Sequence, residues 1–535
     1  MANYLKNTLR LLRLDAKDIR AVYAYAIFAG LISLVLPLGI QSMLSYVVAS
    51  ELSTSLVILI ILVTFSILLQ GIFQVNQLKL IERLKQKAFV RLAYAFNEQA
   101  QKTDLVQVKP LKLREYVNRY FDISNFQKSI TKLLIDVPTS VIQIFFGLIL
   151  LALYHPLFIL FGLVLLGVLV LILAVTGRKG MRTSINESNS KYEMAFWLQE
   201  NTERAADFAA LDFAQFQREK TNRIMSGYLF HRTKHFRVLM SQYYSLVIFK
   251  VIISGLMLSV GAYLLLEQFI SIGQFVAAEI VIILLLSSVE KLIGALDDAY
   301  DLLTSVKKMY DMLDLPSTSK ASLEPLDDLQ TLEFENFQIF DGEQQSKILN
   351  FQVQRGDVEV ILDPSGRGFY HFLRALGSSG RLYKGQIRLN EIWDESSSKV
   401  KLTNHFSFLG AQSNVFNGTI LQNINADGNS TYDQIVDIAK RIGASDLILK
   451  LPNTYETIID ERAETLNPQL RKNILLMRTF CSKRPIWVLE EPFRDLPRAQ
   501  KELLIDFLKK DESHIAILCT RSNSTAELFK SIVKL

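Results

Sequence analysis

Residues 362–370 have the spacing of a phosphate-binding loop but lack its two chemically essential side chains. The segment reads Leu-Asp-Pro-Ser-Gly-Arg-Gly-Phe-Tyr, with Phe369 in place of the phosphate-binding lysine and Tyr370 in place of the Mg²⁺-binding serine or threonine. Such a loop holds phosphate through a glycine-rich backbone nest and one lysine charge. A benzyl ring carries no charge, so the main attraction for β- and γ-phosphates is missing. The frame of the loop is kept and its chemistry is not.

Composition places this loop in a membrane protein. The chain has 535 residues, half of them hydrophobic, which is too long for one domain and too apolar for an ordinary soluble protein. The formal net charge is only +6, and no nucleic-acid partner is expected. Its two cysteines, Cys481 and Cys519, are not spaced as a zinc or redox pair, so we expect reduced cytosolic thiols.

Six apolar runs are long enough to span a bilayer, given the roughly 20 residues that a spanning helix needs. Residues 1–20 precede them and alternate leucine with charged residues at helical spacing, which predicts an amphipathic helix on the membrane surface. An even number of spans puts both ends of this domain on one side. The predicted spans are residues 21–48, 55–75, 134–154, 156–175, 243–267 and 272–293.

The connectors between these spans predict the orientation. The short turns 49–54, 155–156 and 267–271 contain no lysine or arginine, whereas the long connectors 76–132 and 177–242 are rich in both. By the positive-inside rule the long connectors and both ends of the chain are cytosolic. Apolar residues recur at helical spacing within the long connectors, which indicates that the spans continue as cytosolic helical stalks.

The cytosolic remainder of the chain predicts an α/β domain. The transmembrane domain covers residues 21–314, a linker rich in proline and serine covers 315–330, and the cassette covers 331–535. Residues 332–340 and 357–362 are predicted strands, and a helix starts near residue 370. The loop at 362–370 therefore has the strand–loop–helix context that a phosphate-binding loop requires.

Four ordered landmarks make the chain similar to half-transporters of the ATP-binding cassette (ABC) exporter family. They are residues 362–376 (Walker A), 417–424 (the GTIxxNI segment), 466–478 (the signature helix) and 484–491 (Walker B). The resemblance covers nearly the whole length and implies six transmembrane helices followed by one α/β nucleotide-binding domain. It assigns Asp363, Pro364, Ser365, Gly366, Arg367, Gly368, Phe369 and Tyr370 to Walker A, Ala411 and Gln412 to the Q-loop, Leu466, Asn467, Pro468, Gln469 and Leu470 to the signature, Glu490 and Glu491 to Walker B, and Thr520 to the switch loop.

The departures from the family pattern weaken the nucleotide contacts of Walker A, the signature, the Q-loop and the switch loop. Asp363 replaces the first Walker A glycine and adds a negative charge among phosphate oxygens. Pro468 removes a backbone N–H from the start of the signature helix, where donors would point at phosphate. Thr520 stands in place of the switch histidine, and Ala411 in place of the Q-loop glutamine, with Gln412 one position away.

Glu491 occupies the position of the family's general base, after Glu490 in place of the Mg²⁺-binding aspartate. A carboxylate activates water only when a bound, Mg²⁺-charged nucleotide presents its γ-phosphate. We therefore expect no catalytic residue, resident nucleotide or metal in this chain's own site, with ATP and Mg²⁺ held in a partner's site. Phe369 and Tyr370 are expected to be core or interface aromatics.

Lys250 lies well inside the fifth predicted span and Glu279 well inside the sixth. Each costs about 3 kcal/mol at mid-membrane unless it is paired or hydrated. A structural ion pair between the two and a contact with a substrate cavity are both consistent with the sequence. Outside the membrane, the resemblance implies coupling helices near residues 110–121 and 205–217, with aromatic residues such as Tyr116, Phe208 and Phe213 as plugs.

Three functions are consistent with these features. The first is a degenerate half of an exporter in a bacterial inner membrane or its equivalent, driven by an intact second half-transporter and moving a peptide, protein or amphipathic molecule outward. A periplasmic adaptor and an outer-membrane channel would fit a secretion-type exporter. The second is a non-transporting scaffold or sensor in the lipid bilayer, and the third, ranked last, is an active homodimeric exporter using Glu491.

Overall fold

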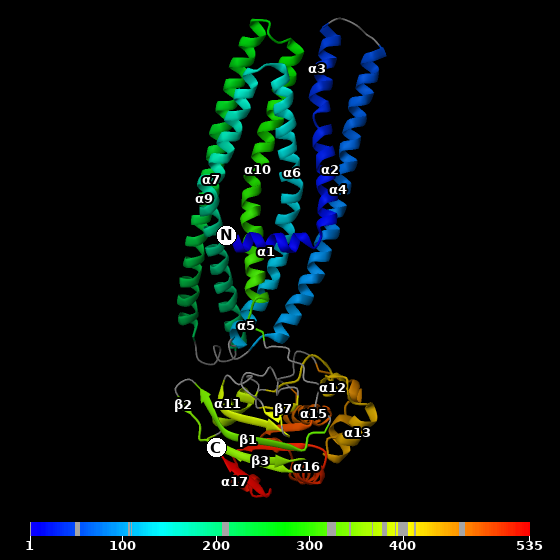
Figure 1. Ribbon diagram of the computed structural model, residues 1–535, viewed down its shortest axis with the longest axis vertical. Helices are drawn as coiled ribbons and strands as arrows, with labels where there is room; N and C mark the ends of the chain where they lie inside the picture. The colour runs from blue at the N-terminus through cyan, green and yellow to red at the C-terminus, as the bar shows by residue number, and fades with distance from the viewer. Residues whose placement is uncertain are drawn as a thin grey trace. The chain divides into compact units, whose positions relative to one another are not determined.

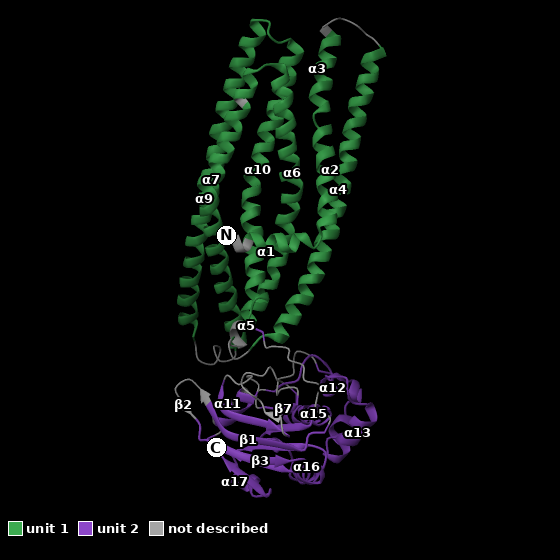
Figure 2. Ribbon diagram, in the orientation of Figure 1, with its two compact units in different colours: residues 1–316 green, residues 317–535 purple. Residues whose placement is uncertain are grey.

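The computed structural model describes residues 2–48, 54–104, 108, 110–205, 213–317, 328–341, 344–365, 367–376, 382–390, 392–393, 405–410, 413–459 and 466–535. The chain forms two compact units, residues 1–316 and 317–535 (Figure 2). We call them the membrane unit and the cassette unit. Their division lies in the stretch of proline and serine that was predicted to be a linker.

Within the described ranges, the membrane unit has six helical segments that are long and apolar enough to cross a membrane. Figure 1 shows the long helices of this unit. The sixth segment has half of its apolar window buried and the second only 11%, so the sixth is central and the second peripheral. The short α1 lies across the long helices, and its amphipathic stretch ends at Arg13 rather than near residue 20. The helices are α1 (Ala2–Arg13), α2 (Ala16–Ile32), α3 (Val35–Val48), α4 (Thr54–Lys102), α5 (Pro110–Val117), η1 (Asn118–Phe121), α6 (Asp122–Tyr154), α7 (Leu157–Glu203), α9 (Ala214–Leu266) and α10 (Ile272–Leu313).

The first span is broken between α2 and α3, at residues 33–34. Pro37 lies four residues after Ser33. Because proline has no backbone N–H, it cannot donate the helical hydrogen bond to the Ser33 carbonyl, and its ring crowds that carbonyl. The Ser33 hydroxyl donates to the carbonyl of Gly30 (2.6 Å) and accepts from the Gln143 amide (3.1 Å). The Gln143 carbonyl oxygen in turn accepts from the Ser288 hydroxyl (2.8 Å). This buried chain of hydrogen bonds connects α2, α6 and α10. Such bonds matter within a membrane, because lipid tails are as apolar as leucine side chains and the hydrophobic effect does little to hold helices together.

Two aromatic residues of the first cytosolic bend make contacts within the membrane unit. Tyr116 stacks under the Arg119 guanidinium, whose carbon lies 4.1 Å from the ring centre. Tyr120 packs edge-on against Phe96, with ring centres 5.7 Å apart. Phe121, by contrast, is 73% exposed. Most of the second bend, including Phe208, lies outside the described residues.

The cassette unit is built around a five-stranded parallel sheet in the order β12-β4-β11-β10-β7. Every residue of β10 and β11 is buried, as expected for strands covered on both faces. A second, antiparallel sheet has the order β2-β1-β5-β6, with β3 also paired to β1. One apolar core lies beneath the helices and another includes residues of both sheets.

The elements of the cassette unit are β1 (Thr331–Asp341), β2 (Gln344–Gln345), β3 (Leu349–Gln354), β4 (Val358–Leu362), α11 (Arg367–Leu376), β5 (Tyr383–Leu389), β6 (Ile392–Trp393), β7 (Phe406–Leu409), β8 (Gly418–Thr419), α12 (Ile420–Ile424), α13 (Tyr432–Arg441), α14 (Ser445–Leu449), η3 (Thr454–Glu456), β9 (Ile458–Ile459), α15 (Pro468–Phe480), β10 (Ile486–Glu490), α16 (Arg498–Lys510), β11 (Ile515–Thr520), α17 (Asn523–Ala526) and β12 (Ser531–Lys534). The predicted α-helical membrane domain followed by an α/β cassette is thereby confirmed.

Candidate functional site

The candidate phosphate-binding loop connects β4 to α11 at the carboxyl end of the parallel sheet. β4 ends at Leu362 and α11 begins at Arg367, which gives the predicted strand–loop–helix context. The backbone N–H of Asp363 donates to the carbonyl of Thr520 at the end of β11 (3.1 Å). The Walker A and switch positions are therefore adjacent. Gly366 and the side chains of Arg367 and Tyr370 lie outside the description.

The carboxylate of Asp363 binds the loop's own donors. Its Oδ1 accepts from the N–H (2.9 Å) and the hydroxyl (2.6 Å) of Ser365, and its Oδ2 accepts from the N–H of Gly368 (2.7 Å). The residue is only 4% exposed. Backbone N–H groups at a loop leading into a helix are the usual ligands of a phosphate. A phosphate here would have to displace an internal carboxylate and then lie beside its negative charge.

Phe369 faces the apolar core of the cassette unit. Its side chain is fully buried in the cluster that also contains Ile361 and Phe372, as predicted for a core aromatic. The loop is also closely packed at Gly368, where an added β-carbon would lie 2.6 Å from Leu535 Cδ2. The position of the phosphate-binding lysine thus contributes to the core.

Glu491, at the general-base position, is held by the segment that follows β11. Its Oε1 accepts from the backbone N–H of Arg521 (2.7 Å), and its Oε2 lies 3.5 Å from the Thr520 hydroxyl. Its backbone has a φ of +44°, which is uncommon for a residue with a side chain. The carbonyl of Glu491 accepts from Lys472 Nζ on α15 (2.7 Å). The structure therefore brings Walker B and switch positions together, as their assignments require.

The signature helix α15 is capped by its own residues. The Asn467 side chain accepts from the N–H of Gln469 (2.9 Å), and Pro468 has no N–H to offer. Gln469 donates through its side chain to Gln500 on α16 (2.8 Å), while Leu470 is buried. Leu466 packs partly buried against the same core. At the start of this helix, the Gln469 N–H is therefore already bonded and position 468 has no N–H to donate to a phosphate.

The Q-loop positions Ala411 and Gln412 lie outside the described residues. Their neighbour Gly410 lies close to the Walker B residue Glu490: a β-carbon added at Gly410 would be 3.8 Å from Glu490 Oε2. Glu490 itself is 6% exposed at the end of β10. Within the described part of the chain, no three His, Cys, Asp or Glu residues are placed to share a metal ion.

A polar cavity of about 440 Å³, which sequence reasoning missed, lies beside Glu490 and Glu491. We call it the basic cavity because four cationic residues contribute to its wall. None of the described Walker A residues lines it. The signal in the sequence is faint: two arginines follow the ends of strands that become neighbours in the sheet. The cationic residues are Arg471, Lys472, Arg494 and Arg521.

In the membrane unit, Lys250 pairs with Glu290 rather than with Glu279. The Lys250 ammonium lies against Glu290 Oε2, and the pairing follows from register, because the two residues are nearly equally far from the turn between α9 and α10. Glu279 lies closer to that turn and therefore cannot face Lys250. Its Oε2 is buried without a hydrogen-bond partner among the described residues. The predicted pair between Lys250 and Glu279 is thus not formed.

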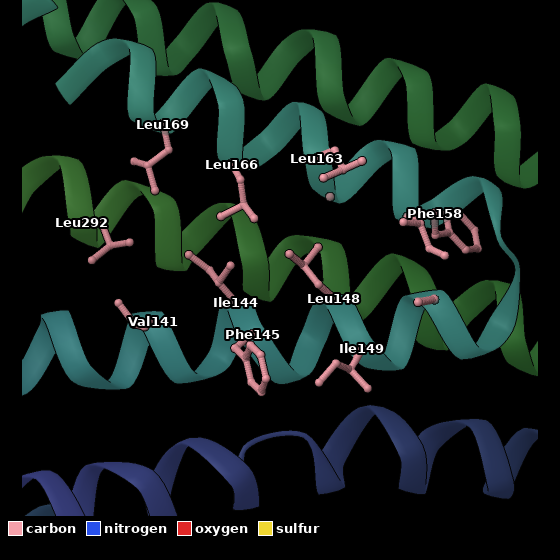
Figure 3. A pocket seen from close by; sticks show the side chains of 13 residues that line it. Val141, Ile144, Phe145, Leu148, Ile149, Phe158, Leu163, Leu166, Leu169 and Leu292 are labelled. Carbon is pink, nitrogen blue, oxygen red and sulfur yellow. The ribbon is translucent and has the colours of Figure 1, made fainter. Parts of the chain in front are cut away.

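An apolar pocket of about 520 Å³ lies among α6, α7 and α10 (Figure 3). Phe145 and Leu148 of α6, Leu163 and Leu166 of α7, and Leu292 of α10 border it. Its lining is almost entirely hydrocarbon, so it can accept an alkyl or aromatic group but cannot hydrogen-bond a polar one.

Comparison with known proteins places this architecture among ABC transporters. The chain is 27% identical over 279 residues to the type I secretion system ATP-binding protein PrsD of Rhizobium meliloti, covering 51% of this chain and 47% of that protein. It is 25% identical over 268 residues to a probable ABC transporter ATP-binding/permease protein of Haemophilus influenzae, covering 49% of each chain. The matches thus span about half the length of these curated relatives. No protein-family model matches the chain.

A solved structure extends the likeness to nearly the whole chain. The structure of a bacterial Atm1-family ABC exporter with ATP bound superposes with a TM-score of 0.78 over 97% of this chain and 93% of that chain, at 15% identity. At that identity the superposition establishes the fold alone. Together with the sequence relatives, it confirms the resemblance drawn from the four landmarks: the chain has the architecture of an ABC exporter half-transporter, six membrane helices fused to a nucleotide-binding domain.

Proposed function

We propose that this chain is the membrane subunit of an ABC-type exporter whose own cassette does not hydrolyse ATP. The observation that carries the proposal is the Asp363 carboxylate, which binds the N–H groups of Ser365 and Gly368 that a phosphate would need. The burial of Phe369 adds to it, because the position of the phosphate-binding lysine is committed to the core. Glu491 then has no nucleotide to act on.

The purified full-length protein is expected to show no ATP turnover and no micromolar affinity for ATP. Isothermal titration with Mg–ATP on protein in lipid nanodiscs measures the affinity, and phosphate release measures the turnover. Replacing Asp363 by Gly removes the internal carboxylate but supplies no cation. The Asp363→Gly variant is therefore also expected to show no ATP turnover and no micromolar affinity for ATP. Micromolar binding by the unmodified protein would overturn the proposal.

An ATPase-competent partner half-transporter is the source of energy that this proposal requires. A homodimer would contain two cassettes with the same Asp363 and Phe369, so a hetero-partner is favoured. Affinity purification from native membranes followed by mass spectrometry is expected to recover an intact half-transporter at equal stoichiometry. Recovery of this chain without such a partner would favour the scaffold or sensor function instead.

The apolar pocket among α6, α7 and α10 supports an amphipathic or peptide substrate with a hydrocarbon group. The type I secretion relative supports the further proposal of a bacterial inner membrane, a periplasmic adaptor and an outer-membrane channel. Replacing Leu163 by Trp would fill the pocket without adding charge. We expect this variant to slow export of an amphipathic substrate by the assembled complex.

The proposed orientation predicts opposite labelling of two exposed sites. A cysteine at Glu267, in the turn between α9 and α10, is expected to react with an impermeant maleimide from outside intact cells. A cysteine at Ser226, on the cytosolic part of α9, is expected to react only after permeabilisation. The native background is low, because burial raises the pKa of Cys481 to about 12 and Cys519 is also buried. Reversed labelling would invert the topology and exclude an exporter.

A further inference from the structure

The wall of the basic cavity contains more positive than negative side chains. Its guanidinium groups come from Arg471 on α15, Arg494 after β10 and Arg521 after β11. None of the three makes a hydrogen bond or ion pair through its side chain with another residue of the described ranges. Arginine forks of this kind match the geometry of oxyanions.

Lys472 adds a fourth charge that is half-buried in the wall. Its Nζ donates to the backbone carbonyl of Glu491 (2.7 Å). Because a backbone carbonyl is uncharged, this hydrogen bond does not neutralise the ammonium. Burial lowers the pKa of Lys472 to about 8, and the nearby Asp495 opposes that shift. The ammonium is therefore still mostly protonated at neutral pH, in a place where a bound anion would stabilise it.

The carboxylates of the cavity do not cancel this charge. Glu491 accepts from the N–H of Arg521 and lies near the Thr520 hydroxyl, so its oxygens already have partners. Glu490 is buried at the end of its strand. With Asp495, three acids face four cations, and the cavity wall has a net positive charge. Glu491 and Asp495 both have positive φ angles, +44° and +67°, and such strained backbone clusters at functional sites.

We propose that the basic cavity binds a phosphate oxyanion, free or as a small phosphate monoester, through Arg471, Arg494, Arg521 and Lys472. The volume of about 440 Å³ is within the usual range for a small-molecule site. This site is separate from the candidate phosphate-binding loop, which is occupied by Asp363. The cassette unit would thus respond to an anionic metabolite although its P-loop holds no nucleotide.

Titration of the full-length protein in nanodiscs with inorganic phosphate, at constant ionic strength set by NaCl, tests the proposal. We expect saturable binding, and at least a tenfold weaker affinity in the double variant Arg494→Ala/Arg521→Ala. Arg498→Ala is the matched control: this exposed arginine on α16 pairs with Glu502 outside the cavity, and its loss is expected to leave phosphate affinity unchanged. Unchanged thermal unfolding of the double variant will show that the fold is intact.

Absence of saturable phosphate binding, or equal affinity in the double variant and the unmodified protein, would overturn the proposal. The test is independent of the proposed function. Displacement of phosphate by micromolar Mg–ATP would contradict the claim that the cassette has no useful ATP affinity, while leaving the anion site in place. Tighter phosphate binding in Asp363→Gly, together with unchanged binding in the arginine double variant, would place the anion at the loop and overturn the proposed site.

Discussion

Replacing Phe369 by lysine is expected to destabilise the cassette unit strongly instead of creating a nucleotide site. The Phe369 ring is fully buried among Phe372 and other core residues. A lysine there has two alternatives. Its ammonium can stay in the core, unpaired and desolvated, or it can turn toward Asp363 and leave a ring-sized void. Truncation of a buried phenylalanine costs about 3–5 kcal/mol, which is a large part of the roughly 5–15 kcal/mol that holds a domain together.

The same substitution is expected not to confer ATP binding. A lysine that reached Asp363 would form an internal ion pair, and its charge would no longer be available to phosphate. Position 370 would still lack a hydroxyl on an aliphatic stem for Mg²⁺, and the signature would still begin with Asn467 and Pro468. A single charge cannot replace this set of donors.

Tryptophan fluorescence makes the measurement specific to the cassette unit. In a Trp197→Phe background, the remaining tryptophans, Trp393 and Trp487, both belong to that unit. Denaturant titration then compares Phe369→Lys with Phe369→Leu, a control that stays apolar and is expected to lose less than about 1.5 kcal/mol. This account of the site would be contradicted if Phe369→Lys unfolded at the same denaturant concentration as the unmodified protein and bound ATP in the micromolar range.

The sequence was sufficient for features that depend on periodicity and composition. Six long apolar runs with basic inner connectors predicted the helices of the membrane unit, and the strand–loop–helix pattern around residues 362–370 predicted an α/β domain. These features depend on local sequence patterns, namely the length of an apolar run, the alternation of side chains and the order of strand, loop and helix. Phe369 was also predicted correctly, because a benzyl ring at a helix start next to a core strand has little reason to face water.

Features set by three-dimensional register could not be predicted. Asp363 was expected to repel phosphate, but only the path of the loop shows that its carboxylate binds the loop's own N–H groups. A pair between Lys250 and Glu279 was considered because the two residues lie in adjacent antiparallel spans, whereas the actual register of α9 and α10 selects Glu290. Tyr116 was expected from the family resemblance to be a plug in a coupling helix, and only the structure shows that its ring also stacks on Arg119.

The basic cavity shows the same limit. Arg494 and Arg521 are far apart in sequence and become neighbours only because β10 and β11 pair in parallel and end at the same edge of the sheet. Without the order of strands, each arginine is one of many solvated charges on a polar domain. The pairing turns two unremarkable positions into one site.

Replacing Asp122 by alanine is expected to destabilise the membrane unit by about 1–3 kcal/mol, because it leaves the buried Tyr192 hydroxyl without its acceptor and removes a negative charge near the buried Lys308. Asp122, the first residue of α6, is 2% exposed. Its carboxylate accepts from the Tyr192 hydroxyl on α7 (2.6 Å) and lies 3.5 Å from Lys191 Nζ. Burial, with the nearby Asp122 charge, raises the pKa of Tyr192, so the phenol remains a donor.

The neighbours of Asp122 explain the size of the expected effect. Lys308 of α10 is 3% exposed and donates to the side chain of Asn189 on α7 (2.5 Å). Arg119, which is 7% exposed, pairs with Asp311 (2.9 Å). Burial, and next the Arg119 charge, lower the pKa of Lys308 to about 8, while Asp311 and Asp122 oppose this shift. Removal of Asp122 therefore leaves Lys308 more exposed to repulsion from Arg119.

A double-mutant cycle separates this electrostatic account from simple loss of packing. In a background with Trp393 and Trp487 replaced by Phe, the fluorescence of Trp197 on α7 reports unfolding of the membrane unit. Tyr192→Phe, which removes one hydrogen bond and no charge, is expected to cost about 1 kcal/mol. Adding Lys308→Met to Asp122→Ala is expected to restore about 1 kcal/mol, because the buried Lys308 ammonium, which has lost the favourable charge of Asp122, is removed as well. Strictly additive losses in the double variant would show that Asp122 stabilises α6 by local packing alone, and that the buried charges of α6, α7 and α10 do not act as one network.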